Sequence, residues 1–487
     1  MIKNLNPKTI FWLIPLLVIY LFSRLQNLTQ IPVFCDEAIY IRWAQLIKNV
    51  DSLRFIPLTD GKQPLFMWLN SIDLKFISDP LVAGRLISVF AGAGTLIILF
   101  LFAVAFFNLA TAVVTAILYL TLPFTFFFDR MALADNLLSF FGLLSLFLAF
   151  LLAKYPRLDL SLILGFSLGL AWLTKSPAIY FVVLSLLTFL LYQFSNIKKI
   201  HLPLIAAFIA FIIYNILRLG PQFHQIALRN LDYIWPLSEI LKHPLDPLIP
   251  HLKDITAIYQ NYISLPIMII FLVGLVLFRR ILFKNKILPI IFLWWLLPLL
   301  ANAGISKVFT ARYILFTIPP LILLMSFFIN KISPKYSYLI VLFFSLFNIF
   351  SIYNLSANAF KVTLPPTDTG YLSDWTSGWG IKPAADYLIS ESKSHNIIIG
   401  TEGYFGTLPD GLQIYTDSLK NLTVFGIGIG INKIPEKLLD ARLYGDEVYL
   451  LINQSRNKLL STETDRLELV KSYPKPGSDT LQLYRLR

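Results

Sequence analysis

The sequence predicts a polytopic α-helical membrane protein that ends in a small α/β domain. The composition, the lengths of the apolar runs and a change of pattern near residue 357 support this fold class. Of the 487 residues, 56% are hydrophobic and 15% are aromatic, and the mean hydropathy of +0.69 is far too high for a soluble globular protein. Apolar runs of roughly 17–25 residues recur, and a helix of this length crosses a hydrocarbon core of about 30 Å.

We expect about eleven transmembrane helices from these runs. The first covers Thr9 to Ser23, and we interpret it as an uncleaved span because no small-residue cleavage site follows its basic start. The other runs lie at about 83–106, 110–128, 132–153, 160–174, 177–194, 201–218, 256–278, 287–304, 313–329 and 336–356. Two long loops, 24–80 and 219–255, interrupt them, and the aromatic residues of the first suit short helices at the membrane interface.

The basic residues predict the orientation of the chain. If the N-terminus is cytoplasmic, the internal loops are rich in basic side chains, as the positive-inside rule requires. These side chains are Lys154, Arg157, Lys198, Lys199, Arg279, Arg280, Lys284, Lys286, Lys331 and Lys335. Both long loops then lie outside, and an odd number of spans exports the C-terminus. We therefore expect an integral plasma membrane protein whose charged outer face and C-terminal domain are extracytoplasmic.

The overall charge and the cysteine content exclude some classes of partner and site. The net charge of +13 would suit nucleic acid in a soluble protein. Here many of the basic residues serve as orientation signals, so we expect membrane lipids and no nucleic acid as partners. The single cysteine, Cys35, rules out an internal disulfide framework and a cysteine-based zinc site.

The pattern after residue 357 is that of a separate domain. Short apolar segments at 396–400, 422–425, 447–452 and 481–484 predict strands, and 381–393 predicts a helix between them. We therefore divide the chain into a transmembrane domain, 1–357, and a soluble α/β domain, 358–487. At about 130 residues the second part is long enough to bury its own core.

Charged residues recur at the outer ends of the apolar runs. They are Asp36, Glu37, Lys62, Arg130, Asp135, Lys175 and Arg312. Taken singly, an acidic pair opens a helix and a cation snorkels to the headgroups. Taken together, costly charges that converge near a bilayer indicate a functional site.

The residue types of this set predict a chemistry. Lys62, Lys175 and Arg312 suit a phosphate or pyrophosphate, while a carboxylate can take a proton from a hydroxyl. Transfer from a lipid phosphate needs that combination, because the leaving phosphate requires charge compensation and no general acid.

A metal site is a second possibility in the loop 219–255. Its candidate ligands are His224, His243 and His251 with Asp232, Asp246 and Asp254. No tight ligand spacing supports a divalent metal, and the alternative is that these are ordinary loop residues. We expect no other cofactor.

Several segments, in this order, resemble the glycosyltransferase C superfamily. They are Asp36-Glu37, Lys62-Gln63-Pro64, Arg130 with Asp135, Leu173-Thr174-Lys175 and Arg312-Tyr313. The set is similar to the signature of the branch that holds protein O-mannosyltransferases and aminoarabinose–lipid A transferases. The resemblance covers roughly residues 10–330.

The resemblance implies an enzyme that takes a hexose or pentose from a polyprenyl-phosphate carrier and inverts the anomeric carbon. The acceptor would be a hydroxyl of a protein, lipid or glycan. By the family pattern Asp36 is the catalytic base. The implied donor- and substrate-binding residues are Glu37, Lys62, Arg130, Asp135, Lys175, Arg312 and Tyr313. Trp294-Trp295 is followed by Leu296 and not by Asp, which argues against transfer of a whole oligosaccharide.

Two other function classes compete with the transferase. A lipid or sugar transporter also has many spans and intramembrane charges. However, the charges here gather at outer helix ends, and the sequence shows no two-half symmetry. A membrane-anchored scaffold for the C-terminal domain would leave those charges unexplained.

Overall fold

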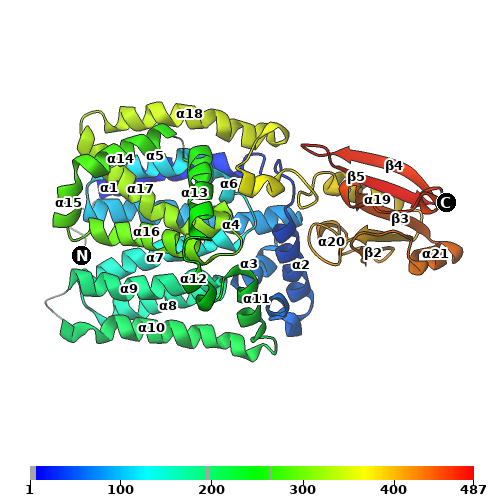
Figure 1. Cartoon of the computed structure of the whole chain (residues 1–487), viewed down its shortest axis with the longest axis horizontal. Coiled ribbons are helices and arrows are strands. Elements are labelled where there is room, and N and C mark those ends of the chain that lie inside the picture. Colours follow the sequence, from blue (N-terminus) through cyan, green and yellow to red (C-terminus); the bar gives the residue numbers. More distant parts are fainter. Residues whose placement is uncertain (1–6, 194–196, 264) are drawn as a thin grey trace. The chain divides into compact units, whose positions relative to one another are not determined.

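The computed structural model describes residues 7–193, 197–263 and 265–487 (Figure 1). Each of its two compact units is assembled from separate stretches of chain. The first unit comprises Met1–Gln26, Arg54–Phe66 and Arg85–Tyr353. The second unit comprises Asn27–Leu53, Met67–Gly84 and Asn354–Arg487.

The first unit is helical. Its helices are α1 (Pro7–Leu25), most of α4 (Pro80–Phe106), α5 (Leu109–Thr121), α6 (Pro123–Phe128), α7 (Ala134–Lys154), α8 (Leu158–Thr174), α9 (Ile179–Tyr192), α10 (His201–Tyr214), α11 (Gln225–Tyr233), α12 (Leu237–Lys242), α13 (Leu248–Tyr262), α14 (Leu265–Leu277), α15 (Arg279–Lys284), α16 (Leu288–Ile305), α17 (Ile318–Ile332) and most of α18 (Ser337–Ala357). Short 3-10 turns include η2 (Ile56–Asp60), η3 (Ser176–Ala178) and η6 (Ala311–Thr317).

Membrane-spanning length is reached by only some of these helices. Among the described residues, six are long and apolar enough to cross a bilayer, and α13 with α14 makes a seventh if the bent pair is one span. Four shorter apolar helices, Phe11–Leu25, Leu109–Thr121, Leu158–Thr174 and Ser176–Tyr192, fall on other expected runs. The chain is thus an integral membrane protein, and the number of eleven spans stays a prediction.

The run expected at 110–128 is broken, which corrects the predicted helix. Helix α5 ends at Thr121, Leu122 is extended, and α6 begins at Pro123. Proline has no backbone N–H and restricts the residue before it, so the hydrogen-bond ladder stops here. Helix α6, which follows the break, ends directly before Asp129 and Arg130.

Close packing of α8 against α10 depends on two glycines one turn apart. A Cβ at Gly165 would lie 2.7 Å from Cβ of Ile209, and one at Gly169 would lie 2.6 Å from Cδ1 of Ile213. Small residues spaced in this way let membrane helices approach closely. The two helices run side by side in Figure 1 and fix the end of α8, where Lys175 follows.

The second unit contains a five-stranded sheet. Its strands are β1 (Ile397–Glu402), β2 (Leu422–Gly428), β3 (Glu447–Asn453), β4 (Leu467–Pro474) and β5 (Thr480–Leu486). The order is β2-β1-β3-β5-β4, parallel across the first three strands and antiparallel across the last two pairings. Its helices include α19 (Ile381–Glu391), α20 (Asp410–Thr416), α21 (Glu436–Leu443) and α22 (Ser461–Thr464). The predominantly helical architecture with a small C-terminal sheet is confirmed.

Helices α2 (Cys35–Asn49) and α3 (Leu65–Asp73) also contribute to the second unit. The backbone N–H of Cys35 donates to the carbonyl of Thr376 over 3.1 Å, and the N–H of Gly378 donates to the carbonyl of Val33 over 2.8 Å. Gln45 of α2 donates to the carbonyl of Ile414 in α20 over 2.8 Å. The segment that carries Asp36 is therefore tied to the C-terminal part of the chain.

Candidate functional site

A partly buried ion pair joins Asp135 to Lys175. Asp135 lies in the first turn of α7, and Lys175 is the extended residue between α8 and η3. Nζ of Lys175 lies 2.5 Å from Oδ1 of Asp135. The Asp135 side chain is 2% exposed and that of Lys175 is 24% exposed. The carboxylate is therefore fixed inside the unit, while the ammonium group sits nearer the surface.

Tyr313 lies against the same lysine, and Arg312 lies beside the Tyr313 ring. Nζ of Lys175 is 4.7 Å from the centroid of the Tyr313 ring, and Cζ of Arg312 is 5.2 Å from it. Nδ2 of Asn302 donates to the carbonyl of Tyr313 over 3.0 Å and holds this turn against α16. Two cations thus lie within about 5 Å of one aromatic ring, and a carboxylate pairs with one of them. We call Asp135, Lys175, Arg312 and Tyr313 the cation cluster.

One oxygen of Asp135 marks an unsatisfied position in the cluster. Oδ2 is buried and has no hydrogen-bond partner within residues 7–193, 197–263 and 265–487. A buried carboxylate oxygen without a donor is costly. A hydroxyl group of a bound substrate is a suitable donor.

The segment of Lys62 is connected to the cation cluster through its neighbour. Nε2 of Gln63 donates to Oγ of Ser176 over 2.7 Å, next to Lys175. Nζ of Lys62 lies 3.5 Å from Oδ2 of Asp60, whose Oδ1 is 3.5 Å from Nε of Arg229. Lys62 therefore pairs with Asp60, and it is the hydrogen bond of its neighbour Gln63 that links this segment to the residue after Lys175.

The turn before Lys62 requires glycine. Gly61 closes η2 with a φ of +64°, and a Cβ there would lie 2.5 Å from Cβ of Arg229 and 2.6 Å from the carbonyl oxygen of Gln225. Both the left-handed backbone and the contact with α11 exclude a side chain. This turn sets the position of Lys62.

Arg130 belongs to a different buried network. Its Nη1 donates to the carbonyl of Gln26 over 2.8 Å and to that of Ser23 over 3.3 Å. Its guanidinium lies 5.0 Å from the Phe126 ring. These contacts clamp the segment between α6 and α7 to the end of α1.

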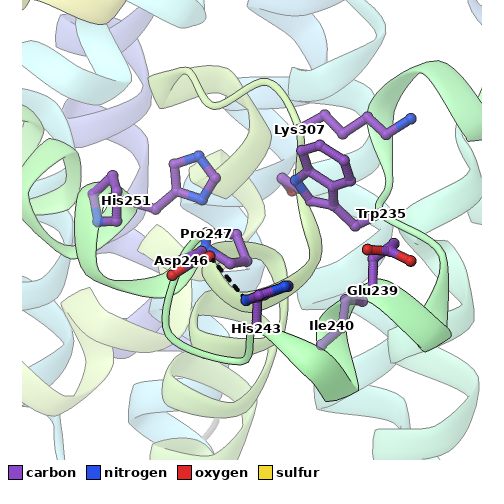
Figure 2. A pocket seen from close by; sticks show the side chains of 10 residues that line it. Trp235, Glu239, Ile240, His243, Asp246, Pro247, His251 and Lys307 are labelled. Carbon is purple, nitrogen blue, oxygen red and sulfur yellow. Dashed lines mark ion pairs between the residues drawn. The ribbon is translucent and has the colours of Figure 1, made fainter.

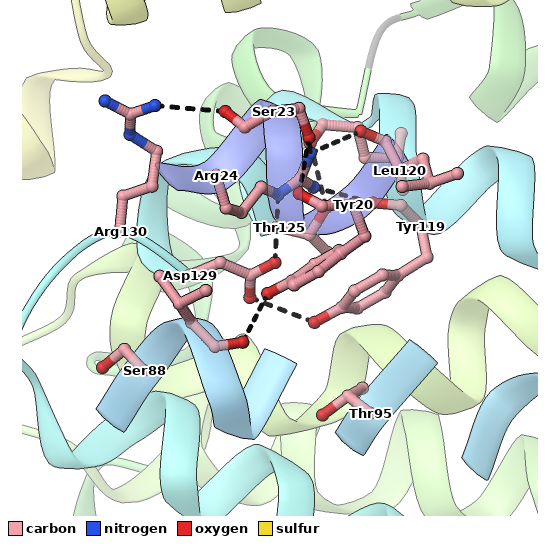
Figure 3. A network of polar contacts seen from close by, with 12 residues as sticks. Tyr20, Ser23, Arg24, Ser88, Thr95, Tyr119, Leu120, Thr125, Asp129 and Arg130 are labelled. Carbon is pink, nitrogen blue, oxygen red and sulfur yellow. Dashed lines mark hydrogen bonds and ion pairs between the residues drawn. The ribbon is translucent and has the colours of Figure 1, made fainter. Parts of the chain in front are cut away.

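Figure 3 shows a second arginine, Arg24, beside this clamp. Nε of Arg24 lies 3.4 Å from Oδ2 of Asp129, whose Oδ1 accepts a hydrogen bond from the Tyr119 hydroxyl over 3.0 Å. The Tyr20 hydroxyl donates to the carbonyl of Val89 over 3.0 Å. Arg24, Asp129 and the two tyrosines were not predicted from the sequence. The only signal was the position of Arg24 and Asp129 at the ends of apolar runs.

Asp36 and Glu37 begin α2 in the second unit. The Glu37 side chain is completely buried, and its Oε2 accepts a hydrogen bond of 2.9 Å from the backbone N–H of Phe34. This is the reciprocal half of a capping box, which satisfies a donor at the helix start. Asp36 is partly exposed. The two carboxylates therefore have different surroundings.

The histidines and aspartates of the loop 219–255 do not gather as metal ligands. No group of three or more metal-binding side chains occurs among the described residues. His251 makes a hydrogen bond of 2.8 Å with the carbonyl of Ala303, and His243 lies 3.5 Å from Asp246. Within the first unit the structure thus brings Asp135, Lys175, Arg312 and Tyr313 together and places Lys62 beside them, while Arg130 stands in the clamp.

Comparison with known families agrees with these motifs. Residues 61–217 match the family of dolichyl-phosphate-mannose-protein mannosyltransferases. The match includes Lys62, Arg130, Asp135 and Lys175. An uncharacterized protein of Aquifex aeolicus strain VF5 is 26% identical over 301 residues. The alignment covers 60% of this chain and 66% of that relative, just under two thirds of its length.

Solved structures give the fold. ArnT from Cupriavidus metallidurans in the apo state superposes with a TM-score of 0.59 over 97% of both chains, at 13% identity. This chain shares the fold of that ArnT. The same ArnT bound to undecaprenyl phosphate gives a TM-score of 0.58 over 97% of both chains, at 13% identity. The Archaeoglobus fulgidus oligosaccharyltransferase AglB, with an inhibitory peptide and dolichol phosphate, gives 0.53 at 11% identity, covering 92% of this chain and 69% of that one. The resemblance to the glycosyltransferase C superfamily is confirmed.

Proposed function

We propose that this protein is an inverting glycosyltransferase that moves a sugar from a polyprenyl-phosphate carrier to an acceptor hydroxyl. The observation that carries the proposal is the cation cluster of Asp135, Lys175, Arg312 and Tyr313. Two cations and one carboxylate leave a local excess of positive charge. Such a site suits a phosphate anion, which Arg binds through two donors and Lys binds as a point charge.

The cluster is built to hold both parts of the donor. Lys175 and Arg312 compensate the charge that the phosphate gains as the sugar leaves. Asp135 keeps the Lys175 amine in place through Oδ1, and its Oδ2 accepts a hydroxyl of the sugar. Lys62 adds charge from the neighbouring turn, and Arg130 positions the α7 start that carries Asp135.

Asp36 acts as the base in the transfer step. Its carboxylate takes the proton of the acceptor hydroxyl while the hydroxyl oxygen forms a bond to the anomeric carbon. The bond from that carbon to the phosphate oxygen breaks on the opposite face, and the electron pair leaves with the polyprenyl phosphate. The products are an inverted glycoside and protonated Asp36, which loses its proton to water.

We propose that this reaction takes place on the outer face of the plasma membrane. Each expected apolar run carries a long helix, a shorter apolar helix or the bent pair. The basic residues favour a cytoplasmic N-terminus. The acceptor is a protein, lipid or glycan on that face, and the soluble α/β domain at 358–487 is exported with it.

Donor binding tests the cation cluster. Lys175→Ala or Arg312→Ala should weaken the binding of undecaprenyl phosphate by ~1–3 kcal/mol, as loss of a charged hydrogen bond does. The matched control is Lys198→Ala, which removes an exposed lysine of a predicted cytoplasmic loop. Binding is measured on the full chain in nanodiscs. Unchanged affinity in both cluster variants would remove them from the site.

Sugar transfer tests the activity itself. Membranes that contain the wild-type chain should move a radiolabelled sugar from a polyprenyl-phosphate donor to an acceptor, and membranes with Lys175→Ala should do so poorly. The anomeric configuration of the product, read by NMR, should be opposite to that of the donor. Retention of configuration would contradict the single-step mechanism.

A further inference from the structure

A separate cavity of about 360 Å³ lies in the first unit. Figure 2 shows the side chains that line it, which come from the loop after α11, from α12 and the start of α13, and from the end of α16. They are Trp235, Glu239, Ile240, His243, Asp246, Pro247, Pro250, His251, Ser306 and Lys307. This volume is in the range of small-molecule sites. None of these residues belongs to the cation cluster.

His251 is held in one orientation at this cavity. Nδ1 lies 2.8 Å from the carbonyl oxygen of Ala303, and the ring stacks on Phe309 with 4.6 Å between centroids. A carbonyl only accepts, so Nδ1 carries the proton, and Nε2 of the neutral imidazole is left as an acceptor. A hydroxyl group is the matching donor.

Trp235 supplies an aromatic surface beside it. Its backbone N–H donates to the carbonyl of Ile305 over 2.8 Å, which fixes the residue against the end of α16. Nζ of Lys307 lies 5.1 Å from the indole ring and donates to the carbonyl of Leu231 over 2.6 Å. In Figure 2 the indole and the imidazole of His251 lie on either side of the cavity.

The charges of the lining favour a neutral ligand. Glu239 and Asp246 bring two carboxylates, Lys307 brings one permanent cation, and Nζ of Lys242 lies 3.1 Å from Oε1 of Glu239. Asp246 also lies 3.5 Å from Nδ1 of His243. Carboxylates repel a phosphate and accept hydrogen bonds from hydroxyls. An aromatic face among hydroxyl acceptors therefore fits a sugar ring better than a lipid phosphate.

The cavity is joined to the cation cluster by two short segments of chain that pair with each other. Ile234 and Ser306 form an antiparallel bridge, and the N–H of Lys307 donates to the carbonyl of Tyr233 over 2.8 Å. The Tyr233 ring meets the Tyr313 ring edge to face, with 6.2 Å between centroids. Trp235 and the cluster residue Tyr313 are thus anchored to the same two segments.

We propose that this cavity binds a neutral sugar of the acceptor, so that the natural acceptor is a glycan or a glycolipid headgroup. The inference rests on the proposed transferase function, which left the acceptor open. Trp235 stacks on the sugar ring, Nε2 of His251 accepts one of its hydroxyls, and Glu239 and Asp246 accept others. The cation cluster holds the donor, and the bridge at 234 and 306 keeps the two sites in register.

Binding of simple sugars tests the cavity directly. The probes are the methyl glycosides of glucose, galactose and mannose, with inorganic phosphate and N-acetyl-threonine amide as competing chemistries. The full chain is kept in a detergent without a sugar headgroup, and binding is followed by saturation-transfer NMR. At least one glycoside should bind, and Trp235→Ala should weaken it by about tenfold or more, the scale of a lost stacking contact at a binding site.

Two further variants separate a local effect from misfolding. His251→Asn keeps an N–H donor for the Ala303 carbonyl and removes the Nε2 acceptor, so we expect about a fivefold loss of sugar binding. The matched control is Trp375→Ala in the second unit, where another partly exposed tryptophan lies 4.1 Å from Arg456. It should leave sugar binding unchanged.

The outcomes distinguish this inference from the proposed function. Undecaprenyl phosphate should bind to Trp235→Ala as to wild type and bind weakly to Lys175→Ala. If the lipid phosphate binds in that way but no glycoside depends on Trp235, the acceptor inference is overturned and the transferase proposal stands. Phosphate or the threonine amide binding in a Trp235-dependent way would also overturn it. Loss of the Lys175 dependence would instead overturn the transferase proposal.

Discussion

Asp36 and Glu37 are adjacent in the sequence and differ in their surroundings. Glu37 is completely buried and accepts the N–H of Phe34, whereas Asp36 is partly exposed. A carboxylate that caps its own helix stabilises the fold, and a carboxylate near the surface can meet an acceptor hydroxyl. The two substitutions should therefore affect different properties.

Asp36→Asn should lower turnover by roughly 10²–10⁴-fold, the usual scale of general-base catalysis. Asn keeps the shape of the side chain and has essentially no basicity. Donor binding should be nearly unchanged, because it depends on the cation cluster. Transfer rates and undecaprenyl phosphate affinity measured on the same preparation check both statements, and a fully active variant would contradict the mechanism.

Glu37→Gln should lower the free energy of unfolding, and it should reduce turnover much less than Asp36→Asn does. The amide oxygen still accepts the Phe34 N–H, but the interaction of a negative charge with the helix N-terminus is lost, which costs about 0.3–1 kcal/mol. Thermal unfolding of the full chain measures the loss. Equal losses of turnover in the two variants would mean that the pair titrates as one unit.

Gly92 is needed by the buried network of Arg24 and Asp129. A Cβ at this position would lie 2.0 Å from the Tyr20 hydroxyl and 2.7 Å from Cγ of Asp129. Gly92→Ala should therefore destabilise the first unit by about 1–3 kcal/mol, the scale of overpacking. The control is Gly304→Ala, because a Cβ there has nothing within 4 Å. Unfolding midpoints of the two variants should differ, and equal midpoints would count against the network.

The stability of the second unit should depend on the protonation of Asp410. Burial raises the pKa of this carboxyl to about 6, although the Gly406 N–H, at 2.6 Å, and Arg42 oppose the rise. The folded state then binds the proton more tightly than the unfolded state, so stability falls as the pH rises from about 4 to about 6 and is flat above. The full effect is about 3 kcal/mol.

Asp410→Asn isolates this contribution. The amide oxygen accepts from Gly406 and does not titrate. The difference in stability between wild type and variant should change through that window, measured by proteolysis of the full chain at pH 4 to 7. A difference that is constant with pH would contradict the raised pKa.

At the scale of elements, α2 is held on α20 by polar contacts. Arg42 pairs with Asp417, and Nδ2 of Asn49 donates to the same carboxylate over 3.1 Å. Gln45 reaches the carbonyl of Ile414. The helix that begins at Asp36 therefore depends on a helix far along the chain.

Reversing one charge of this contact should disturb Asp36 through its helix. Asp417→Arg places two cations together, and we expect a few-fold loss of turnover with unchanged donor affinity, because partly exposed ion pairs contribute only ~0.2–1 kcal/mol. The double variant Arg42→Asp with Asp417→Arg should restore most of the loss. No rescue would mean that the contact does not position the base.

The sequence predicted the elements better than their breaks and pairings. Long apolar runs and the strands at 396–400 and 447–452 were recognisable because periodicity and length are local properties. Strand β4 was not predicted, since most of its side chains are exposed and charged or hydroxyl residues interrupt its apolar ones. Pro123 is plain in the sequence, but the apolar residues on both sides of it made 110–128 look like one continuous span.

In the candidate site too, local motifs were predicted and long-range contacts were not. Asp135, Lys175, Arg312 and Tyr313 could be named from motifs in a fixed order. The Gln63 link to Ser176, the clamp of Arg130 and the Arg24 network join residues far apart in sequence, and no local pattern encodes such contacts. The buried capping role of Glu37 required knowledge of what covers α2.

For the whole molecule, we expect a cytoplasmic N-terminus and an extracytoplasmic C-terminus. A reporter fused after Arg487 should be active only outside, because about eleven spans export the end of the chain. A reporter inserted after Arg280 should be active only in the cytoplasm. Activity of the Arg487 fusion in the cytoplasm would mean that the number of spans is wrong by one.

The discontinuous second unit has a consequence for biosynthesis. Gln45 and its partner Ile414 are 369 residues apart, so at about 5–20 residues per second α2 leaves the ribosome about 20–70 s before α20 exists. During that delay α20 cannot cover α2, so the surface that α2 later buries against α20 stays exposed. We therefore expect the sequence of α2 to be selected for solubility and protease resistance during synthesis, as well as for its packing in the folded protein.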